Sequence, residues 1–209
     1  MNIYYVIPAR KGSKGLPNKN RILLQYTIQK IPEDYYSNVI ITTDDEEIKN
    51  QCGSFRVIDR PGELANDTAN IRDVLIHASQ GMREKDLIVM LYLPYPEREW
   101  NEVLDAIDFF VTYKCKSMLC RKEVMTHPYL CVYESGKQVV KHDLYRRQDY
   151  PKCYEISHYI AIAIVEELHN LNKNLYNIDT FYYDIQDVID VDTEEDLKRY
   201  EDSISNLDG

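Results

Sequence analysis

Short apolar runs alternate with segments of helical periodicity through the first half of the chain. The candidate strands, rich in β-branched and aromatic residues, are 2–7, 38–42, 55–58 and 87–93. The candidate helices, with apolar residues at helical spacing or a capping signal at Thr43 or Asp44, are 21–31, 43–53, 69–81 and 99–113. This alternation predicts βαβ units and therefore a mainly parallel sheet covered by helices on both faces.

The regular alternation of candidate strands and helices ends after Lys116. Residues 128–133 and 137–141, joined by Glu134-Ser135-Gly136, predict a hairpin. A long strand is expected at 157–165, further strands at 181–185 and 188–191, and a last helix from Thr193. The length of 209 residues fits one domain. We expect a single domain over 1–209 with an excursion at about 127–151.

Composition narrows the classes of function. The 35 acidic residues outnumber the 25 basic ones, so the net charge of -10 disfavours nucleic-acid binding. Five cysteines, an odd number without a CxxC pair, argue against a disulfide framework and a zinc site. No apolar stretch approaches the roughly 20 residues of a membrane span, and no export signal is visible. We expect a cytoplasmic protein without a membrane partner.

The loop after the first candidate strand carries the strongest chemical signal. Residues 7–21 read IPARKGSKGLPNKNR, so basic side chains gather at Arg10, Lys14 and Lys19. Gly12 and Gly15 allow sharp turns that expose backbone N–H groups. The loop follows the carboxyl end of a strand, where ligands gather in open α/β sheets, and it suits a polyphosphate. Its spacing fits neither GxxxxGK[ST] nor GxGxxG.

This loop resembles the signature loop of the acylneuraminate cytidylyltransferases, the CMP-sialic acid synthetases. Further segments resemble that family in the expected order, namely ITTDDEEI (41–48), RPGELANDTA (60–69), RRQDYP (146–151) and IDVDTEEDL (189–197). The resemblance spans nearly the whole chain. It implies an α/β, three-layer Rossmann-like nucleotide-diphospho-sugar transferase fold with a mixed, mainly parallel sheet and a small dimerisation excursion.

The same resemblance implies a nucleotidyltransferase that transfers CMP from CTP to an acidic 2-keto-3-deoxy sugar, sialic acid or a related nonulosonate, and releases pyrophosphate. The catalytic residues that it implies are Arg10, Lys14, Lys19, Asp190 and Asp192. The CTP contacts that it implies are Ala9, Arg10, Gly12, Ser13, Lys14, Lys19, Asn20, Arg60, Asp67 and Thr68.

The spacing of Asp190 and Asp192 also predicts a metal site independently of the resemblance. Two residues apart on an extended segment, they point to the same side and can present both carboxylates to one Mg²⁺ ion. In the resemblance they are the metal ligands. The alternative is structural, with Asp192 or Thr193 as the N-cap of the last helix.

The segment that binds the acceptor sugar in the family has a different sequence in this chain. Where the family reads LQPTSPLR, residues 91–98 read LYLPYPER. The sugar-binding residues carried over are Tyr92, Tyr95, Arg146, Arg147 and Gln148. In the family the excursion forms a homodimer, and Arg146 and Arg147 would reach the partner subunit's sugar; a solvated hairpin end explains them equally. His158 is a substrate contact or, more simply, a structural histidine.

Two alternatives to this function remain open. One is the related synthetase for the eight-carbon ulosonic acid of lipopolysaccharide, whose loop resembles IPARYxSxRLPxKP and fits Gly12-Ser13-Lys14-Gly15 less well. The other is a non-catalytic module that binds CTP or a CMP-sugar, suggested by the altered acceptor segment. The presence of both Asp190 and Asp192 argues against a pure binding module.

Overall fold

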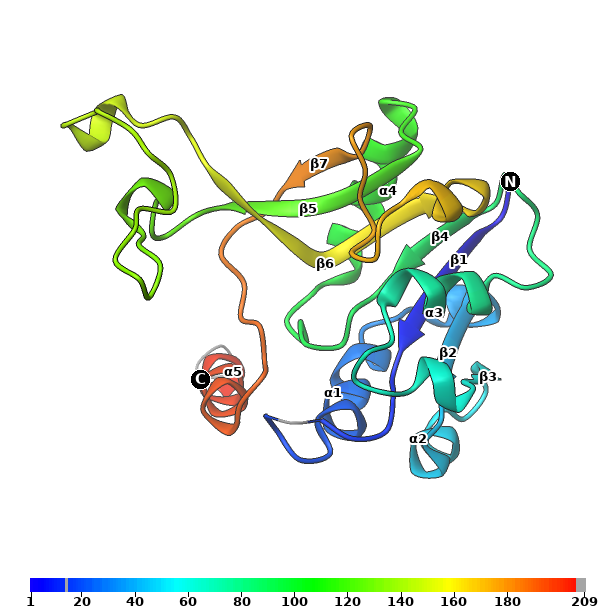
Figure 1. Cartoon of the computed structure of the whole chain (residues 1–209). Coiled ribbons are helices and arrows are strands. Elements are labelled where there is room, and N and C mark those ends of the chain that lie inside the picture. The colour runs from blue at the N-terminus through cyan, green and yellow to red at the C-terminus, as the bar shows by residue number, and fades with distance from the viewer. Residues whose placement is uncertain (14, 206–209) are drawn as a thin grey trace.

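A computed structural model describes residues 1–13 and 15–205 of the chain. A seven-stranded sheet runs through it in the order β3-β2-β1-β4-β6-β5-β7 (Figure 1). The strands are β1 (Ile3–Pro8), β2 (Val39–Thr43), β3 (Arg56–Asp59), β4 (Leu87–Met90), β5 (Ser117–Glu123), β6 (Tyr154–Ile164) and β7 (Phe181–Asp184). β6 is antiparallel to β4 and β5, and the other neighbouring pairs are parallel. The mixed, mainly parallel α/β sheet predicted from the sequence is confirmed.

Helices cover both faces of this sheet. The α-helices are α1 (Lys19–Ile28), α2 (Glu46–Gln51), α3 (Ile71–Ala78), α4 (Trp100–Thr112) and α5 (Glu194–Ser205). The 3-10 helices are η1 (Glu33–Asn38), η2 (Gly62–Leu64), η3 (Pro128–Leu130), η4 (Arg147–Asp149) and η5 (Val165–Asn170). One apolar cluster joins the sheet to α1, α2, α4 and α5, and a second joins it to α3 and η5. The chain therefore forms three layers.

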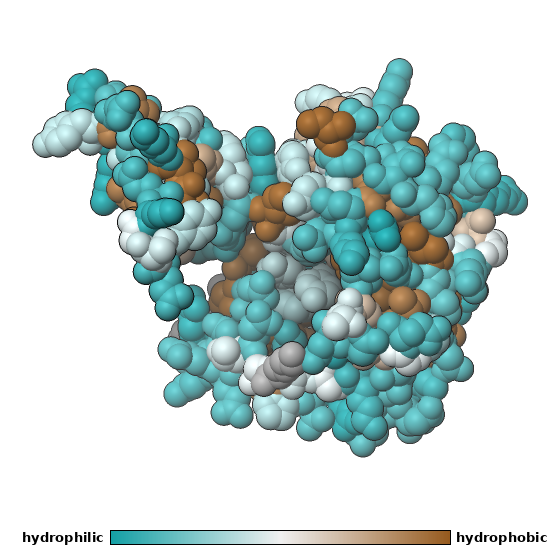
Figure 2. All heavy atoms as spheres, viewed as in Figure 1, coloured by the Kyte–Doolittle hydropathy of each residue, from teal (hydrophilic) through white to brown (hydrophobic). Residues whose placement is uncertain are grey.

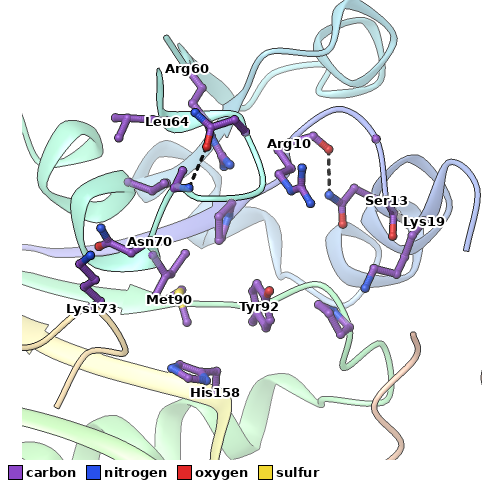
Figure 3. Close-up of a pocket in the computed structure, with 18 of the residues that line it drawn as sticks. Arg10, Ser13, Lys19, Arg60, Leu64, Asn70, Met90, Tyr92, His158 and Lys173 are labelled. Atoms are coloured by element: carbon purple, nitrogen blue, oxygen red, sulfur yellow. Dashed lines mark hydrogen bonds between the residues drawn. The ribbon is translucent and has the colours of Figure 1, made fainter. Parts of the chain in front are cut away.

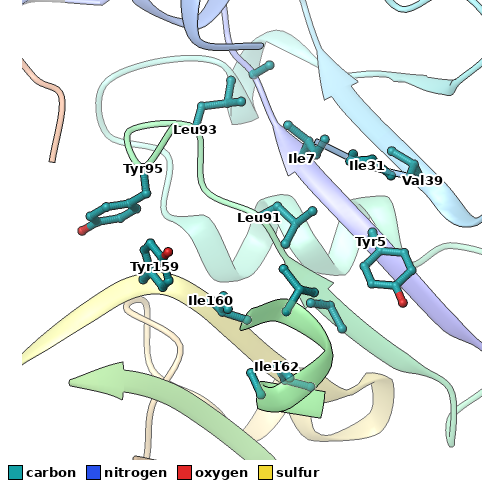
Figure 4. Close-up of a cluster of buried hydrophobic side chains, with 14 of the residues drawn as sticks. Tyr5, Ile7, Ile31, Val39, Leu91, Leu93, Tyr95, Tyr159, Ile160 and Ile162 are labelled. Atoms are coloured by element: carbon teal, nitrogen blue, oxygen red, sulfur yellow. The ribbon is translucent and has the colours of Figure 1, made fainter. Parts of the chain in front are cut away.

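Alternation along the central strands produces these two clusters. On β1, Tyr5 and Ile7 belong to the first cluster, whereas Val6, between them, belongs to the second. Figure 4 shows part of the first cluster, with Ile7 beside Val39 and Leu91 between β1 and β6. Because β1 and β4 are buried on both faces, their sequences read as continuous apolar runs.

Several predicted boundaries were wrong for local reasons. The strand expected at 87–93 ends at Met90, before the prolines of the following turn. Asp45, not Thr43 or Asp44, caps α2, because its carboxylate accepts from the Glu47 N–H at 3.0 Å. β5 was not predicted at all: its first four residues are buried and its last three are polar, so neither periodicity is present.

The segment 188–191 is not a strand. Its backbone N–H groups bond to the turn after β4 instead of to a sheet neighbour, with Val191 donating to the Pro94 carbonyl at 2.8 Å and Ile189 to the Glu97 carboxylate at 2.5 Å. The last helix starts where expected. Thr193 and Asp196 cap it reciprocally, since the Asp196 N–H donates to Thr193 Oγ1 at 3.2 Å and the Thr193 N–H donates to Asp196 Oδ2 at 3.0 Å.

Residues 124–153, here called the arm, project from the body at the upper left of Figures 1 and 2. The hairpin predicted there is reduced to a single bridge, Val132 to Gln138, and Pro128 begins the 3-10 helix η3 where a strand was expected. Among the described residues, no helix is long and apolar enough to cross a membrane.

Candidate functional site

A hollow of about 520 Å³ opens at the carboxyl ends of β1 and β4 (Figure 3). The chain order of the strands reverses between these two, which is the switch point where open α/β sheets bind ligands. Its wall comes from four sources: the first loop, the segment from β3 into α3, the end of β4 with β6, and the turn after η5. The place predicted for the site is therefore a real pocket.

The first loop lines one end of the pocket with Arg10, Gly12, Ser13, Lys19 and Asn20. Figure 3 shows Arg10, Ser13 and Lys19 together at this end. The Asn20 amide donates to the Arg10 carbonyl at 2.8 Å, so the start of α1 holds the loop in place. Gly12 has a φ of 76°, which favours glycine. Lys14, predicted to bind phosphate, lies outside the described residues.

Arg10 and Lys19 of this loop are paired with carboxylates from distant segments. Arg10 Nη2 lies 2.8 Å from Asp67 Oδ1, and Lys19 Nζ lies 2.5 Å from Asp192 Oδ1. Ala9 is fully buried and does not line the pocket; its N–H donates to the Thr42 carbonyl at 3.0 Å. This bond fastens the start of the loop to β2, and the predicted CTP contact of Ala9 stays a prediction.

Arg60 contributes a buried cation to the same pocket. Its guanidinium donates to the Thr42 carbonyl at 2.7 Å, and burial lowers its pKa to about 10. Thr68, predicted beside it, does not line the pocket; its hydroxyl and N–H both donate to Asn66 Oδ1. The turn instead presents Asn66 and, after it, Asn70.

Asp190 and Asp192 lie on the extended segment before α5. Capping of α5 by Thr193 and Asp196 uses neither of their carboxylates. Burial and the nearby charge of Asp192 raise the pKa of Asp190 above its usual value. Two carboxylates whose charges oppose each other, one already against the Lys19 ammonium, form a donor set that suits a hard cation. No group of three or more metal-ligating side chains occurs among residues 1–13 and 15–205, so substrate oxygens would have to complete the coordination.

The predicted acceptor residues separate in the structure. Tyr92 lines the pocket and is 37% exposed. Tyr95 is buried and does not line it; its hydroxyl donates to Asp190 Oδ2 at 3.0 Å. Arg146, Arg147 and Gln148 lie in the arm, outside the pocket of their own chain, where Arg146 pairs with Asp149 at 3.0 Å.

Other pocket residues escaped the sequence analysis. Met90, Lys173 and Asn174 line the end opposite the first loop. His158, which the sequence did single out, also lines the pocket and lies beside Tyr92, with ring centroids 6.2 Å apart. His158 Nε2 lies 3.1 Å from the Asn174 carbonyl and so fastens the turn that carries Lys173. The histidine has a structural bond and a place in the pocket wall. Nothing in the local sequence marks Lys173, because only the fold brings its turn to the pocket.

Comparisons with known proteins agree with this geometry. Residues 4–92 match the model of a family described as Cytidylyltransferase. An N-acylneuraminate cytidylyltransferase of Streptococcus agalactiae serotype III is 28% identical over 210 residues, covering 92% of this chain and 51% of the relative. The chain therefore spans about half the length of that relative. Post-translational flagellin modification protein B of Campylobacter coli is 28% identical, with 94% of this chain and 92% of the relative covered.

Among solved structures, CMP:2-keto-3-deoxy-manno-octonic acid synthetase complexed with CTP superposes with a TM-score of 0.71 at 14% identity. The match covers 99% of this chain and 100% of that chain. This likeness establishes a shared Rossmann-like fold. The resemblance predicted from the first loop is confirmed: the chain is similar to N-acylneuraminate cytidylyltransferases, and residues 4–92 match the cytidylyltransferase family model.

Proposed function

We propose that this chain transfers CMP from CTP to an acidic 2-keto-3-deoxy sugar, sialic acid or a related nonulosonate, and releases pyrophosphate. The observation that carries the proposal is the direct contact between the basic first loop and the aspartate segment. Lys19 and Asp192, 173 residues apart in sequence, meet at 2.5 Å beside the pocket. Lys19 lines the pocket and Asp190 and Asp192 do not, so the ion pair brings the aspartate segment to the edge of the pocket. A basic loop and a pair of carboxylates this close together suit nucleotidyl transfer.

The basic residues of the pocket would bind the triphosphate of CTP. Arg10 and Lys19 would exchange their carboxylate partners for triphosphate oxygens, and Arg60 would add a buried positive charge. The acceptor hydroxyl oxygen forms the new bond to the α-phosphorus, the bond from that phosphorus to pyrophosphate breaks, and the hydroxyl proton passes to solvent. Positioning and charge neutralisation therefore account for the catalysis.

Asp190 and Asp192 are the residues that would hold Mg²⁺. The ion, when bound, supplies positive charge against the phosphate oxygens. Lys19 supports this assignment because its ammonium already lies against Asp192 and can move to a phosphate oxygen nearby.

The direct test measures pyrophosphate release with CTP, Mg²⁺ and a panel of nonulosonic and ulosonic acids. Release with a nine-carbon acid supports the proposal and names the acceptor. Release only with the eight-carbon acid favours the second candidate, which the 0.71 TM-score to its synthetase keeps open. CTP binding without turnover across the panel favours the non-catalytic module.

We also propose that the arm joins two copies of the chain. Its large apolar side chains are exposed in the single chain, among them Met125, Leu130, Val132, Tyr133 and Tyr145. Brown side chains lie along the arm in Figure 2. Light scattering after size exclusion should report twice the chain mass of 24.7 kDa. A monomer at micromolar concentration would remove this proposal and leave the catalytic one in place.

A further inference from the structure

Tyr95 connects the aspartate segment to the wall of the acceptor side. It follows β4, is 8% exposed, and points its hydroxyl at Asp190 Oδ2, 3.0 Å away. Its ring packs between Tyr92, with centroids 6.5 Å apart, and Tyr159, at 5.5 Å. Figure 4 shows Tyr95 beside Tyr159 above β6. A side chain held in this way has few other orientations available.

The hydrogen bonds around Tyr95 run in one direction. An ionised Asp190 only accepts, so the Tyr95 hydroxyl must donate to it. Tyr95 then accepts from Ser157 Oγ at 3.3 Å, and Ser157 Oγ accepts from the Tyr159 N–H at 3.2 Å. A backbone amide fixes one end of this chain and a carboxylate fixes the other, so every hydroxyl proton has a defined place.

An irregularity in β6 makes the chain possible. Opposite the step from Leu119 to Cys120 on β5, the register on β6 jumps from Ala161 to Ser157, which leaves residues 158–160 as a bulge. Both backbone groups of Tyr159, in the middle of the bulge, are bonded elsewhere: its N–H donates to Ser157 Oγ, and its carbonyl accepts from Arg98. The bulge therefore places the Ser157 hydroxyl within hydrogen-bond distance of the Tyr95 hydroxyl.

Arg98 joins the turn that carries Tyr95 to strand β6. It is 5% exposed, and its guanidinium donates to the carbonyls of Tyr92 and Tyr159. The backbone before Tyr95 and the strand beneath it are thus tied together. Tyr95 has no freedom to follow a moving Asp190, so the aspartate must conform to the tyrosine.

We infer that Tyr95 is a positioning residue, which holds Asp190 through Oδ2 and thereby fixes the carboxylate that, with Asp192, would hold the cation. The carboxylate torsion of an aspartate is broad and two-fold, so a single fixed donor selects its orientation. Hydrogen bonds to ligating carboxylates typically change metal affinity about 10- to 100-fold. The inference rests on the proposed function, because it assigns Asp190 to the metal. It also replaces a direct contact of the Tyr95 hydroxyl with the sugar.

The test compares Mn²⁺ binding by wild type and Tyr95→Phe at one fixed pH with CTP present and no acceptor. Electron paramagnetic resonance of free Mn²⁺ measures the Kd. The variant keeps the ring and loses the hydroxyl, and we expect the Kd to rise about 10-fold. The Mg²⁺ concentration for half-maximal rate should rise by a similar factor, while the KM for CTP at saturating Mg²⁺ stays within about two-fold, a split that a general loss of structure would not produce.

Tyr26→Phe is the matched control. The Tyr26 hydroxyl also donates to a carboxylate, Glu201 Oε1 at 3.1 Å, but away from the pocket. This control should leave the Mn²⁺ Kd unchanged. Ser157→Ala, which removes the donor behind Tyr95, gives a second measure and should raise the Kd at least about two-fold.

An unchanged Mn²⁺ Kd in both Tyr95→Phe and Ser157→Ala overturns the inference, as does a wild type that binds no Mn²⁺ with CTP. Failure of the proposed function looks different. In that case the wild type releases no pyrophosphate with any acid, although the Mn²⁺ comparison still gives its own answer.

Discussion

Lys19 Nζ lies 2.5 Å from Asp192 Oδ1, and this ion pair links the first loop directly to the aspartate segment. The Lys19 side chain is 13% exposed and that of Asp192 is 66% exposed. Water therefore reaches the carboxylate more readily than the ammonium group. A cation that binds Asp192 would release Lys19 toward an anion in the pocket, so metal and phosphate binding should be coupled.

Asp192→Asn tests the carboxylate. The amide keeps the shape of the side chain and removes its charge, so we expect CMP-sugar formation to fall on the order of 100-fold with the fold intact. Asp187→Asn is the control, because Asp187 also pairs with a lysine, Lys122 at 3.0 Å, but Lys122 does not line the pocket as Lys19 does. Initial rates at saturating substrates, with circular dichroism for the fold, decide it. Turnover close to wild type in Asp192→Asn would end the metal assignment.

Lys19→Met tests the ammonium group. Loss of one charge-assisted hydrogen bond to a phosphate corresponds to about 10- to 100-fold in affinity, so CTP should bind that much more weakly in calorimetry. The KM for the acceptor should change little. Lys30→Met, which removes a lysine paired with Glu99 at 2.6 Å outside the pocket, should leave CTP binding as in wild type. Equal CTP affinity in both variants would contradict the role of Lys19.

The sequence predicted strands and helices well where their buried residues form a single continuous or periodic apolar pattern. β1, β2 and the helices α3 and α4 carry unbroken apolar patterns, and their existence was foreseen. β5 and the arm were misjudged because their pairing depends on which partners the fold supplies. A long β6 accounts for β5, and the 3-10 helix that begins at Pro128 replaces the first strand expected in the arm.

The residues of the site were also predicted where they follow a local pattern and missed where only the fold brings them together. Arg10, Gly12 and Ser13 lie on one contiguous loop, so a local pattern was enough to place them together. Tyr95 was placed against the sugar because its neighbours in sequence suggested it, yet its hydroxyl points at a segment almost 100 residues away. Lys173 was missed because no local pattern marks a turn that only tertiary structure brings to the pocket.

Gly15→Ala tests the close approach of the first loop to the aspartate segment. A Cβ at Gly15 would collide with the backbone carbonyl of Asp192, so one of the two segments must move. We expect weaker CTP binding and a free energy of unfolding lower by about 1–3 kcal/mol, typical of overpacking. Gly62→Ala is the control, because nothing lies within 4 Å of a Cβ there. Calorimetry with CTP and urea unfolding of both variants measure the effect; a Gly15→Ala protein that matches Gly62→Ala in both would show that the loop adjusts freely.

Asp86→Asn tests a buried carboxylate that fastens the first residues to β4. Asp86 is 1% exposed and accepts from the Asn2 N–H at 2.7 Å and from the Arg83 N–H at 3.1 Å. These bonds, chiefly the one from Asn2, hold the pKa of Asp86 below its usual value. The ionised form is therefore favoured in the folded state, and its stabilising effect is present above the unfolded pKa of about 3.9 and lost as the pH falls through the lower folded pKa.

We expect Asp86→Asn to lower the free energy of unfolding by about 1–2 kcal/mol at neutral pH, the range of a charge-assisted hydrogen bond weakened to a neutral one. The difference from wild type should hold down to about pH 5 and shrink below about pH 4. Urea unfolding at a series of pH values measures it. Asp108→Asn, an exposed aspartate on α4, should track wild type throughout. A difference for Asp86→Asn that stays constant into the acid range would mean that lost packing, not lost charge, causes the effect.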